Sequence, residues 1–200
     1  RRVADTPHVL LAGEGAQRFA ERAGFQAYRQ VTAKAQARHQ VVSANLRHKG
    51  IGNLPKSWGA FDAESYWNFA KAYADVNEEV DTVGAVAMDD LGHFAVATST
   101  GGSIPMLAGR VGDTPLMGCG FYVGLHGAVA ATGIGEEIIR HMVSRTVYDA
   151  IRLGEAPQDA CDAAVDAFAV ALPIGVIAIS SGGHACASNV PMATSMATES

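Results

Sequence analysis

The residues of this sequence that could perform chemistry begin with a threonine at the start of a strand-like segment. Thr82 follows the acidic, loop-like stretch 77–81 and precedes the small, apolar run 83–89, which has the composition of a buried β-strand. A second strand is predicted over 93–99, and Thr98-Ser99-Thr100-Gly101-Gly102 lies at its end. A threonine at the mouth of one strand, with hydroxyl groups at the end of its neighbour, indicates a hydroxyl nucleophile. Threonine is also simply a favourable strand residue, and Thr82 alone does not decide between the two interpretations.

Three further motifs follow in order along the chain: Gly109-Arg110-Val111-Gly112-Asp113-Thr114-Pro115, Gly118-Cys119-Gly120, and Ala131-Thr132-Gly133-Ile134-Gly135-Glu136. Together with Asp81-Thr82-Val83-Gly84 and the Thr-Ser-Thr-Gly-Gly run, they resemble the plant-type asparaginase / isoaspartyl peptidase family of N-terminal-nucleophile hydrolases, whose near relative is glycosylasparaginase. The resemblance covers residues 6–187, and it includes a Pro-His-Val…Gly-Glu-Gly-Ala passage matched by residues 7–16.

The resemblance implies that Thr82 is the nucleophile of an amidohydrolase. A threonine hydroxyl becomes effective when the α-amine of the same residue acts as the base, because that amine titrates near pH 7.7–8.0. Thr82 must therefore become a chain terminus, and the family achieves this by cutting itself at the bond that corresponds to Asp81–Thr82. The resemblance makes Thr100 the hydroxyl that orients Thr82. We expect β-aspartyl amides, either isoaspartyl dipeptides or L-asparagine, as substrates.

Two other motifs are expected to hold the substrate. Thr132 and Gly133 precede a predicted helix, whose first N–H groups favour negative charge, and this suits an oxyanion hole. Gly135 completes a Gly-x-Gly pattern, but no βαβ context supports a dinucleotide. Arg110 could bind a carboxylate in bidentate fashion and Asp113 an ammonium group, so together they would recognise the α-carboxylate and α-amine of an aspartyl residue. The alternative is an Arg–Asp pair that only braces a loop.

The elements that must position these residues can be predicted from periodicity and turn signals. The first is a strand over 8–12, followed by a helix over 16–23 that Gly24 closes. Sequence alone indicates a mixed α/β protein, whereas the resemblance implies an α+β fold with a four-layer αββα sandwich. The remaining predicted elements are helices over 26–47 and 63–74 around a loop over 49–59, the hairpin of 83–89 and 93–99, a strand over 127–131, helices over 135–153 and 157–172, and a hairpin of 174–180 and 184–187.

Composition limits the function classes. The chain has 200 residues, 48% of them apolar, and a net charge of −5. It therefore lacks the basic character of a nucleic-acid-binding protein, and no apolar run is long enough for a membrane span. Three widely spaced cysteines (Cys119, Cys161 and Cys186) indicate reduced thiols and a cytoplasmic protein. His184 and Cys186 share a strand face without a second pair of ligands, so we expect no metal and no cofactor.

The organisation expected is one domain over 1–200, with a shortened α-subunit-like part over 1–81 and a β-subunit over 82–200. The family's initial segment has no counterpart here, so we expect a fragment or a shortened relative, assembled as a homodimer of αβ units. Gly101 follows the asparaginase form, since glycosylasparaginases carry asparagine there. The end, 188–193, matches the family's Asn-Thr-x-Gly-Met only loosely. The alternatives are glycosylasparaginase-type activity, or a maturation-defective relative that serves as a binding scaffold.

Overall fold

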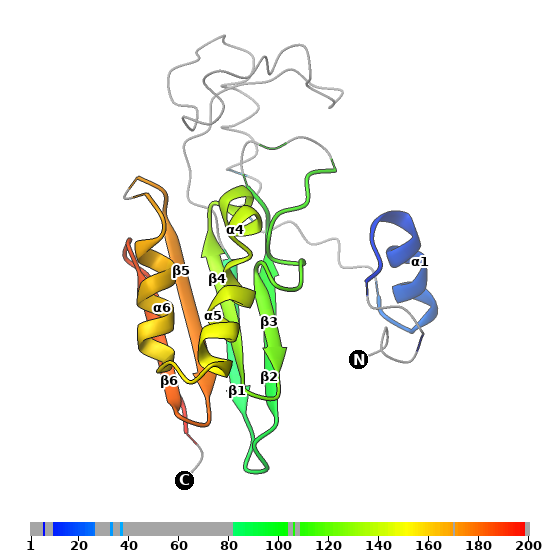
Figure 1. The fold of residues 1–200 in the computed structure, drawn as a ribbon. Helices are drawn as coiled ribbons and strands as arrows, with labels where there is room; N and C mark the ends of the chain where they lie inside the picture. Colours follow the sequence, from blue (N-terminus) through cyan, green and yellow to red (C-terminus); the bar gives the residue numbers. More distant parts are fainter. Residues whose placement is uncertain are drawn as a thin grey trace.

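The computed structural model describes Thr6, Ala33, Ala37, Met106 and residues 10–26, 82–103, 109–169 and 171–198. The predicted loop over 49–59, the predicted helix over 63–74 and the predicted cleavage residue Asp81 lie outside the described residues. Ala33 and Ala37 are helical, in agreement with the helix predicted over 26–47. Figure 1 shows helix α1 apart from a body of two sheets and three helices.

The first described element is helix α1, Gly13–Arg22, which begins three residues earlier than predicted. Gly24 ends it at φ +85° as expected, because glycine adopts this conformation without strain. The strand predicted over 8–12 is wrong for its described part, since residues 10–12 have no strand partner in the described ranges. A strand needs a neighbour to satisfy its backbone groups, and Leu10 is exposed to solvent.

The hairpin predicted around Thr82 is confirmed. Strands β1, Thr82–Met88, and β2, Phe94–Thr100, pair in antiparallel register, with Thr82 opposite Thr100 and Met88 opposite Phe94. Asp89 holds the turn between them, because its Oδ1 atom accepts hydrogen bonds from the N–H groups of Leu91 at 2.9 Å and His93 at 2.7 Å. These contacts lower the pKa of Asp89, the His93 backbone hydrogen bond having the largest effect.

The second sheet has four antiparallel strands in the order β3-β4-β5-β6. The prediction missed β3, Phe121–Gly124, which is only four residues long. Strand β4, Gly127–Gly133, extends two residues beyond its predicted end. The final hairpin is confirmed as β5, Ile174–Ser180, and β6, Gly183–Ser188. Strands β4 and β5 are buried along most of their length, which explains their nearly continuous apolar sequence.

These elements form three layers. Helices α5, Val143–Arg152, and α6, Pro157–Asp166, cover one face of the four-stranded sheet, and the β1–β2 hairpin covers the other (Figure 1). Gly84 permits this sheet-on-sheet contact, because a Cβ atom built on it would lie 3.0 Å from the Ala130 Cβ atom. The α+β class is therefore confirmed. The described residues supply three layers of the predicted four-layer sandwich, and a fourth layer is not among them.

The single helix predicted over 135–153 is wrong, since two helices occupy that range. Helix α4, Gly135–His141, ends at Met142, which adopts the left-handed conformation (φ 47°, ψ 47°), and α5 follows it. The break lets the N–H groups of Ser144 and Arg145 donate to the carbonyls of Cys119 and Gly118, at 3.2 and 2.9 Å. These partners satisfy helix N–H groups that would otherwise be unpaired at the helix start. Met142 is 49% exposed rather than on the buried face.

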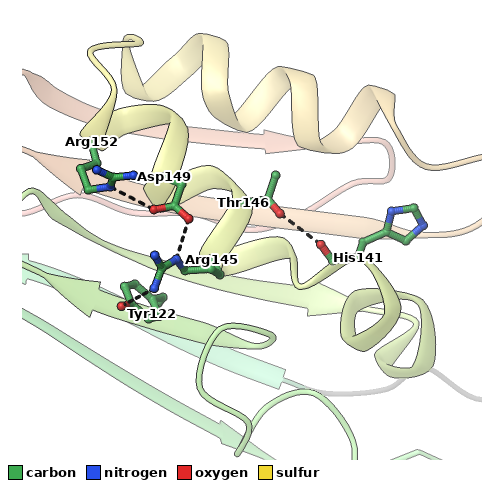
Figure 2. Close-up of polar contacts among 6 residues, drawn as sticks. All are labelled: Tyr122, His141, Arg145, Thr146, Asp149 and Arg152. Atoms are coloured by element: carbon green, nitrogen blue, oxygen red, sulfur yellow. Dashed lines mark hydrogen bonds and ion pairs between the residues drawn. The ribbon is translucent and has the colours of Figure 1, made fainter.

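A charged cluster fastens α5 to strand β3, as Figure 2 shows. The Arg145 guanidinium donates to the Asp149 carboxylate at 2.6 Å and to the Tyr122 hydroxyl at 2.8 Å. Arg152 donates to the other Asp149 oxygen at 3.1 Å, and Thr146 donates to the His141 carbonyl across the helix break. The Arg145–Tyr122 contact therefore joins helix α5 to strand β3.

Helix α6 starts at Pro157 as predicted but ends at Asp166, six residues before the predicted end at Leu172. Its apolar stripe has helical spacing, and Ala160, Cys161 and Ala164 are buried, as is Phe168 just beyond the helix. Because the helix ends early, the segment that follows it returns the chain to β5, which runs antiparallel to β4. No helix in the described ranges is long and apolar enough to cross a membrane.

Candidate active site

The hydroxyl groups of Thr82 and Thr100 meet at the open end of the β1–β2 hairpin. Strand register places the two residues opposite each other, and their Oγ1 atoms are 3.1 Å apart. The N–H of Gly102 donates to Thr100 Oγ1 at 3.1 Å. A hydroxyl oxygen that accepts from a backbone N–H can still donate its own hydrogen, so Thr100 can donate to Thr82. The register thus brings together the predicted nucleophile and the hydroxyl predicted to orient it.

The end of β4 lies at the same end of the molecule. The turn of the β1–β2 hairpin and helix α4, which follows β4, lie at opposite ends of the sheets, so β1 and β4 run in opposite directions (Figure 1). Gly84 contacts Ala130 where the two strands cross. Thr82 precedes Gly84 by two residues and Thr132 follows Ala130 by two, so both threonines lie toward the same end of this contact.

Strand β4 ends at Gly133, which packs against Pro173. It has φ +143°, and a Cβ atom there would collide with the Pro173 carbonyl oxygen, so only glycine fits. The N–H of Ile134 donates to the same oxygen at 3.2 Å. The Ile134 N–H is therefore paired. Thr132 and Gly133, the predicted oxyanion donors, lie opposite Gly175 and Ile174 in the β4–β5 ladder.

Arg110 pairs with a residue that the sequence did not predict as its partner. Its Nε and Nη2 atoms donate to the two oxygens of the Glu136 carboxylate, at 3.0 and 3.1 Å. The Arg110 side chain is 17% exposed, whereas that of Glu136 is 53% exposed. The hydrogen bonds from Arg110 lower the pKa of Glu136 and keep it ionised. Arg110 makes no hydrogen bond to Asp113 among the described residues, although its positive charge acts on the Asp113 carboxyl and lowers its pKa.

Asp113 is buried, and its Oδ2 atom has no hydrogen-bond partner among the described residues. Burial raises the pKa of Asp113 above the ordinary carboxyl value; nearby Glu136 acts in the same direction and Arg110 against it. An unpartnered, buried carboxylate oxygen is costly, and each such atom in a native structure needs an explanation. A ligand that carries a positive charge would supply the missing partner.

Two glycines allow these charged groups to lie close to the backbone. A Cβ atom on Gly135 would lie 2.7 Å from Asp113 Oδ1 and 2.8 Å from Arg110 Nη2, and one on Gly112 would lie 2.6 Å from Arg110 Nη1. The loop itself is tied to the hairpin, since Thr98 Oγ1 donates to the Thr114 carbonyl at 3.1 Å. The loop that carries Arg110 and Asp113 is therefore joined to strand β2 by a direct contact.

Cys119 is a packing residue in this loop. It is buried within the hydrophobic core, and burial raises the pKa of its thiol above the ordinary value. Burial also raises the pKa of Cys161 to about 12. A thiol that stays protonated is neither a good nucleophile nor a metal ligand. In the described ranges no three His, Cys, Asp or Glu side chains are grouped as a metal site, and His184 and Cys186 stay without further ligands there.

The chain end lies beside β4 and β5. The Asn189 side chain accepts a hydrogen bond from the Ile174 N–H and donates to the Leu172 carbonyl, both at 2.9 Å. Met192 covers Gly175, which is the strand partner of Thr132, and its sulfur occupies the space where a Cβ atom would be. The segment that only loosely matches the family's ending is thus packed against β5, the strand that pairs with β4.

Two residues of this site were not predicted from the sequence. Glu136 carried one usable signal, an acidic residue in the first helical turn after Gly-x-Gly, but nothing pointed to Arg110 as its partner. Gly112 carried only its place within the Gly-Arg-Val-Gly-Asp motif. Of the predicted residues, Thr82 lies with Thr100, and Arg110 and Asp113 lie around Gly135. Asp81 lies outside the described residues.

Comparison with known proteins agrees with these motifs. A family model described as asparaginase matches residues 1–200. The chain is 38% identical over 161 residues to a plant-type L-asparaginase of Thermococcus kodakarensis, covering 80% of this chain and 49% of the relative. It is 34% identical over 157 residues to an isoaspartyl peptidase of Escherichia coli (76% and 44% covered). It is 33% identical over 162 residues to an N(4)-(β-N-acetylglucosaminyl)-L-asparaginase of Elizabethkingia miricola (80% and 41% covered).

The chain spans about half the length of these curated relatives, or less. Their names cover the two activities and the near relative that the motifs around Thr82 and Arg110 indicated. The match extends over the whole sequence, and the described part has the expected α+β architecture with paired threonines at the mouth of its hairpin. The chain therefore belongs to the asparaginase family that includes plant-type L-asparaginases and isoaspartyl peptidases.

Proposed function

We propose that this chain forms an N-terminal threonine amidohydrolase that cleaves β-aspartyl amide bonds, in isoaspartyl dipeptides, L-asparagine or both. The observation that carries the proposal is the 3.1 Å contact between the Thr82 and Thr100 hydroxyls at the mouth of β1. Strand packing alone does not require two hydroxyls to meet there. The names of the relatives, plant-type L-asparaginase and isoaspartyl peptidase, support the same chemistry.

The reaction needs a free α-amine on Thr82, so maturation comes first. The Thr82 hydroxyl attacks the carbonyl carbon of Asp81, the peptide nitrogen leaves as the new α-amine, and water hydrolyses the resulting ester. The products are a chain that ends at Asp81 and a chain that begins at Thr82. The new amine is partly neutral near pH 7.7–8.0 and can accept a proton.

Substrate hydrolysis repeats this sequence with an external amide. The Thr82 oxygen bonds to the β-carbonyl carbon while its proton moves to the α-amine, and the carbonyl oxygen becomes an oxyanion. Thr132 and Gly133 stabilise that oxyanion, an effect worth roughly 3–4 kcal/mol per donor in comparable sites. The carbon–nitrogen bond then breaks as the leaving nitrogen takes the proton. Water hydrolyses the acyl-enzyme ester and releases aspartate.

Arg110 and Asp113 select the aspartyl part of the substrate. The Arg110 guanidinium binds the α-carboxylate, and the Asp113 Oδ2 atom, which has no protein partner in the described residues, accepts from the α-ammonium. Asp113 Oδ1 and Arg110 Nη2 lie 2.7 and 2.8 Å from the position that a Cβ atom on Gly135 would take, so the two side chains are close enough to bind two substituents of one carbon atom.

A glycosylasparaginase-type activity is the second candidate, because one relative is named N(4)-(β-N-acetylglucosaminyl)-L-asparaginase. It would use the same aspartyl groups and differ only in the leaving group. Turnover of β-aspartyl-leucine, L-asparagine and N4-(β-N-acetylglucosaminyl)-L-asparagine, measured side by side, separates the two candidates.

The test of the proposed function is an intact-mass measurement after prolonged incubation of the purified protein. We expect two fragments, with the new N-terminus at Thr82. Thr82→Ala should stay uncleaved and inactive because it lacks the attacking hydroxyl, whereas Thr82→Ser should retain some cleavage. Efficient cutting after Asp81 in the alanine variant would show that an outside protease is responsible. A wild-type chain that stays intact would favour the non-catalytic scaffold.

A further inference from the structure

The Glu136–Arg110 contact uses one particular edge of the guanidinium. Glu136 accepts from Nε and Nη2, so both Nη1 hydrogens and the second Nη2 hydrogen point elsewhere. Nη1 lies close to Gly112, and Nη2 lies close to Gly135, as Asp113 Oδ1 does; among the described residues neither Nη1 nor the second Nη2 hydrogen has a hydrogen-bond partner. The terminal edge of Arg110 is thus left for a second, end-on carboxylate.

We propose that Glu136 is a positioning residue, which holds Arg110 by its Nε–Nη2 edge and directs the Nη1–Nη2 edge to the substrate α-carboxylate. This inference rests on the proposed function, because it assigns a partner to the residue proposed to bind that carboxylate. It adds a specificity determinant that does not itself touch the reacting atoms.

Arg110 and Glu136 differ in how much of each side chain is exposed to solvent. Arg110 is mostly enclosed, while more than half of the Glu136 side chain is exposed at the rim. An ion pair with one exposed partner contributes little to folding, typically about 0–1 kcal/mol. Fixing a long arginine side chain before the ligand arrives removes an entropic cost from binding instead. The contact therefore has a larger effect on substrate affinity than on stability.

The alternative role for Glu136 is to compete with the substrate for Arg110, because Glu136 is itself a carboxylate. If it merely occupied Arg110 as a competitor, its removal would free the guanidinium and improve substrate binding. The bidentate geometry argues against competition, since the end-on edge stays available while the side-on edge is taken. The two roles thus predict changes of opposite sign in KM.

The experiment compares Glu136→Ala with Glu137→Ala in the full, matured chain. Glu137 is the matched control, because it lies in the same first turn of α4, carries the same charge and pairs with Arg140 instead. The substrates are β-aspartyl-leucine and β-alanyl-leucine, which differ only in the α-carboxylate. Glu136→Ala should raise KM for β-aspartyl-leucine about tenfold, which corresponds to roughly 1.4 kcal/mol. Its kcat, and its turnover of β-alanyl-leucine, should stay within about twofold of the wild type, a difference of roughly 0.4 kcal/mol.

Glu137→Ala should leave the preference between the two substrates unchanged, and Glu136→Gln, which keeps one acceptor oxygen for Arg110, should lose less than the alanine variant. A lower KM in Glu136→Ala would establish competition and overturn the inference. An equal loss for both substrates, or the same loss in Glu137→Ala, would overturn it as well. Thermal unfolding of all three variants checks the fold; if Glu136→Ala does not fold, Glu136→Gln against Glu137→Gln gives the same comparison.

Failure of the proposed function has a different signature. A wild-type protein that hydrolyses neither dipeptide, or that hydrolyses both equally, contradicts the assignment of Arg110, and the role of Glu136 falls with it. A wild-type protein that strongly prefers β-aspartyl-leucine, together with a Glu136→Ala variant that keeps the full preference, contradicts only the role of Glu136.

Discussion

The two halves of the candidate site are held in place by different kinds of interaction. The hydroxyl pair, Thr82 and Thr100, is set by the backbone ladder of a hairpin and lies where that hairpin opens to solvent. The charged group, Arg110, Asp113 and Glu136, is set by side-chain contacts between a loop and the first turn of α4. It includes a buried carboxylate whose pKa is raised.

This difference indicates that reactivity and recognition can be altered separately. A strand register depends on the whole ladder, so one side chain can change without moving its neighbours. A network of charged side chains depends on each member, so the loss of one exposes or reorients the others. Substitutions in the hydroxyl pair should therefore change kcat, and substitutions in the charged group should change KM and stability.

The largest effect is expected in the hydroxyl pair. Thr100→Val keeps the β-branched shape and strand propensity but removes the hydroxyl that contacts Thr82, so kcat should fall by about 100-fold or more. Thr100→Ser should retain most of the activity, because a hydroxyl remains. Steady-state rates on β-aspartyl-leucine, with the processed fraction measured by intact mass, provide the test. A Thr100→Val enzyme with a nearly wild-type kcat would mean that the 3.1 Å contact has no catalytic role.

A smaller effect, mainly on KM, is expected for Arg110→Lys. The positive charge stays, but the planar fork that can hold Glu136 and a substrate carboxylate at once is lost. Breaking such a charge-paired contact costs on the order of 2–5 kcal/mol, so kcat/KM should fall at least tenfold. Cleavage at Thr82 should survive, since it does not need the α-carboxylate.

The substrate offers a matched test of the same group. An N-acetylated β-aspartyl dipeptide has no ammonium for Asp113 and should be a poor substrate of the wild type. Equal hydrolysis of the free and acetylated dipeptides would contradict the binding roles of the charged group and would indicate a general amidase.

The smallest effect is expected on thermal stability, and its sign follows from the raised pKa of Asp113. Because burial raises the pKa of Asp113, this residue contributes stability below the unfolded pKa of about 3.9, and that contribution is lost as pH rises through the folded pKa. Asp113→Asn should therefore melt at or above the wild-type temperature at pH 7, and the difference should disappear toward pH 4. Thermal unfolding across this pH range tests the expectation.

Asp89 is the control with the opposite sign. Its pKa is lowered by hydrogen bonds from the turn, so its contribution is present above about pH 3.9 and is lost as pH falls through the folded pKa. Asp89→Asn should accordingly lower the melting temperature at pH 7. A lower melting temperature for Asp113→Asn at pH 7 would mean that Asp113 stabilises its loop and is not kept for ligand binding.

Sequence reasoning succeeded where structure is local. The β1–β2 hairpin follows from two short apolar runs around an Asp-Asp-Leu-Gly turn, and the stripe of α6 follows from helical spacing. The order of the motifs identified the family and the paired threonines. Each of these features depends either on residues close together in the chain or on a motif that can be identified from the sequence alone.

The errors share a nonlocal origin. The break at Met142 is stabilised by carbonyls of Gly118 and Cys119, which belong to a separate loop, so helical periodicity could not reveal it. Strand β3 is short and glycine-flanked, and it is defined by pairing with β4 rather than by its own composition. The contact of Arg110 with Glu136 spans 26 residues, and only tertiary packing brings the two together.

The Asp89 turn has a consequence for how this hairpin can vary in length. If the Asp89 turn is kept, one residue inserted within β2 would turn the side chains between the insertion and Thr100 to the opposite face, because strand side chains alternate. The hairpin would still form, with Thr100 pointing away from Thr82. With the turn fixed, the number of strand residues between the two threonines therefore decides whether their hydroxyls meet, and Asp89, at the far end of the hairpin, fixes that turn by accepting hydrogen bonds from two backbone N–H groups.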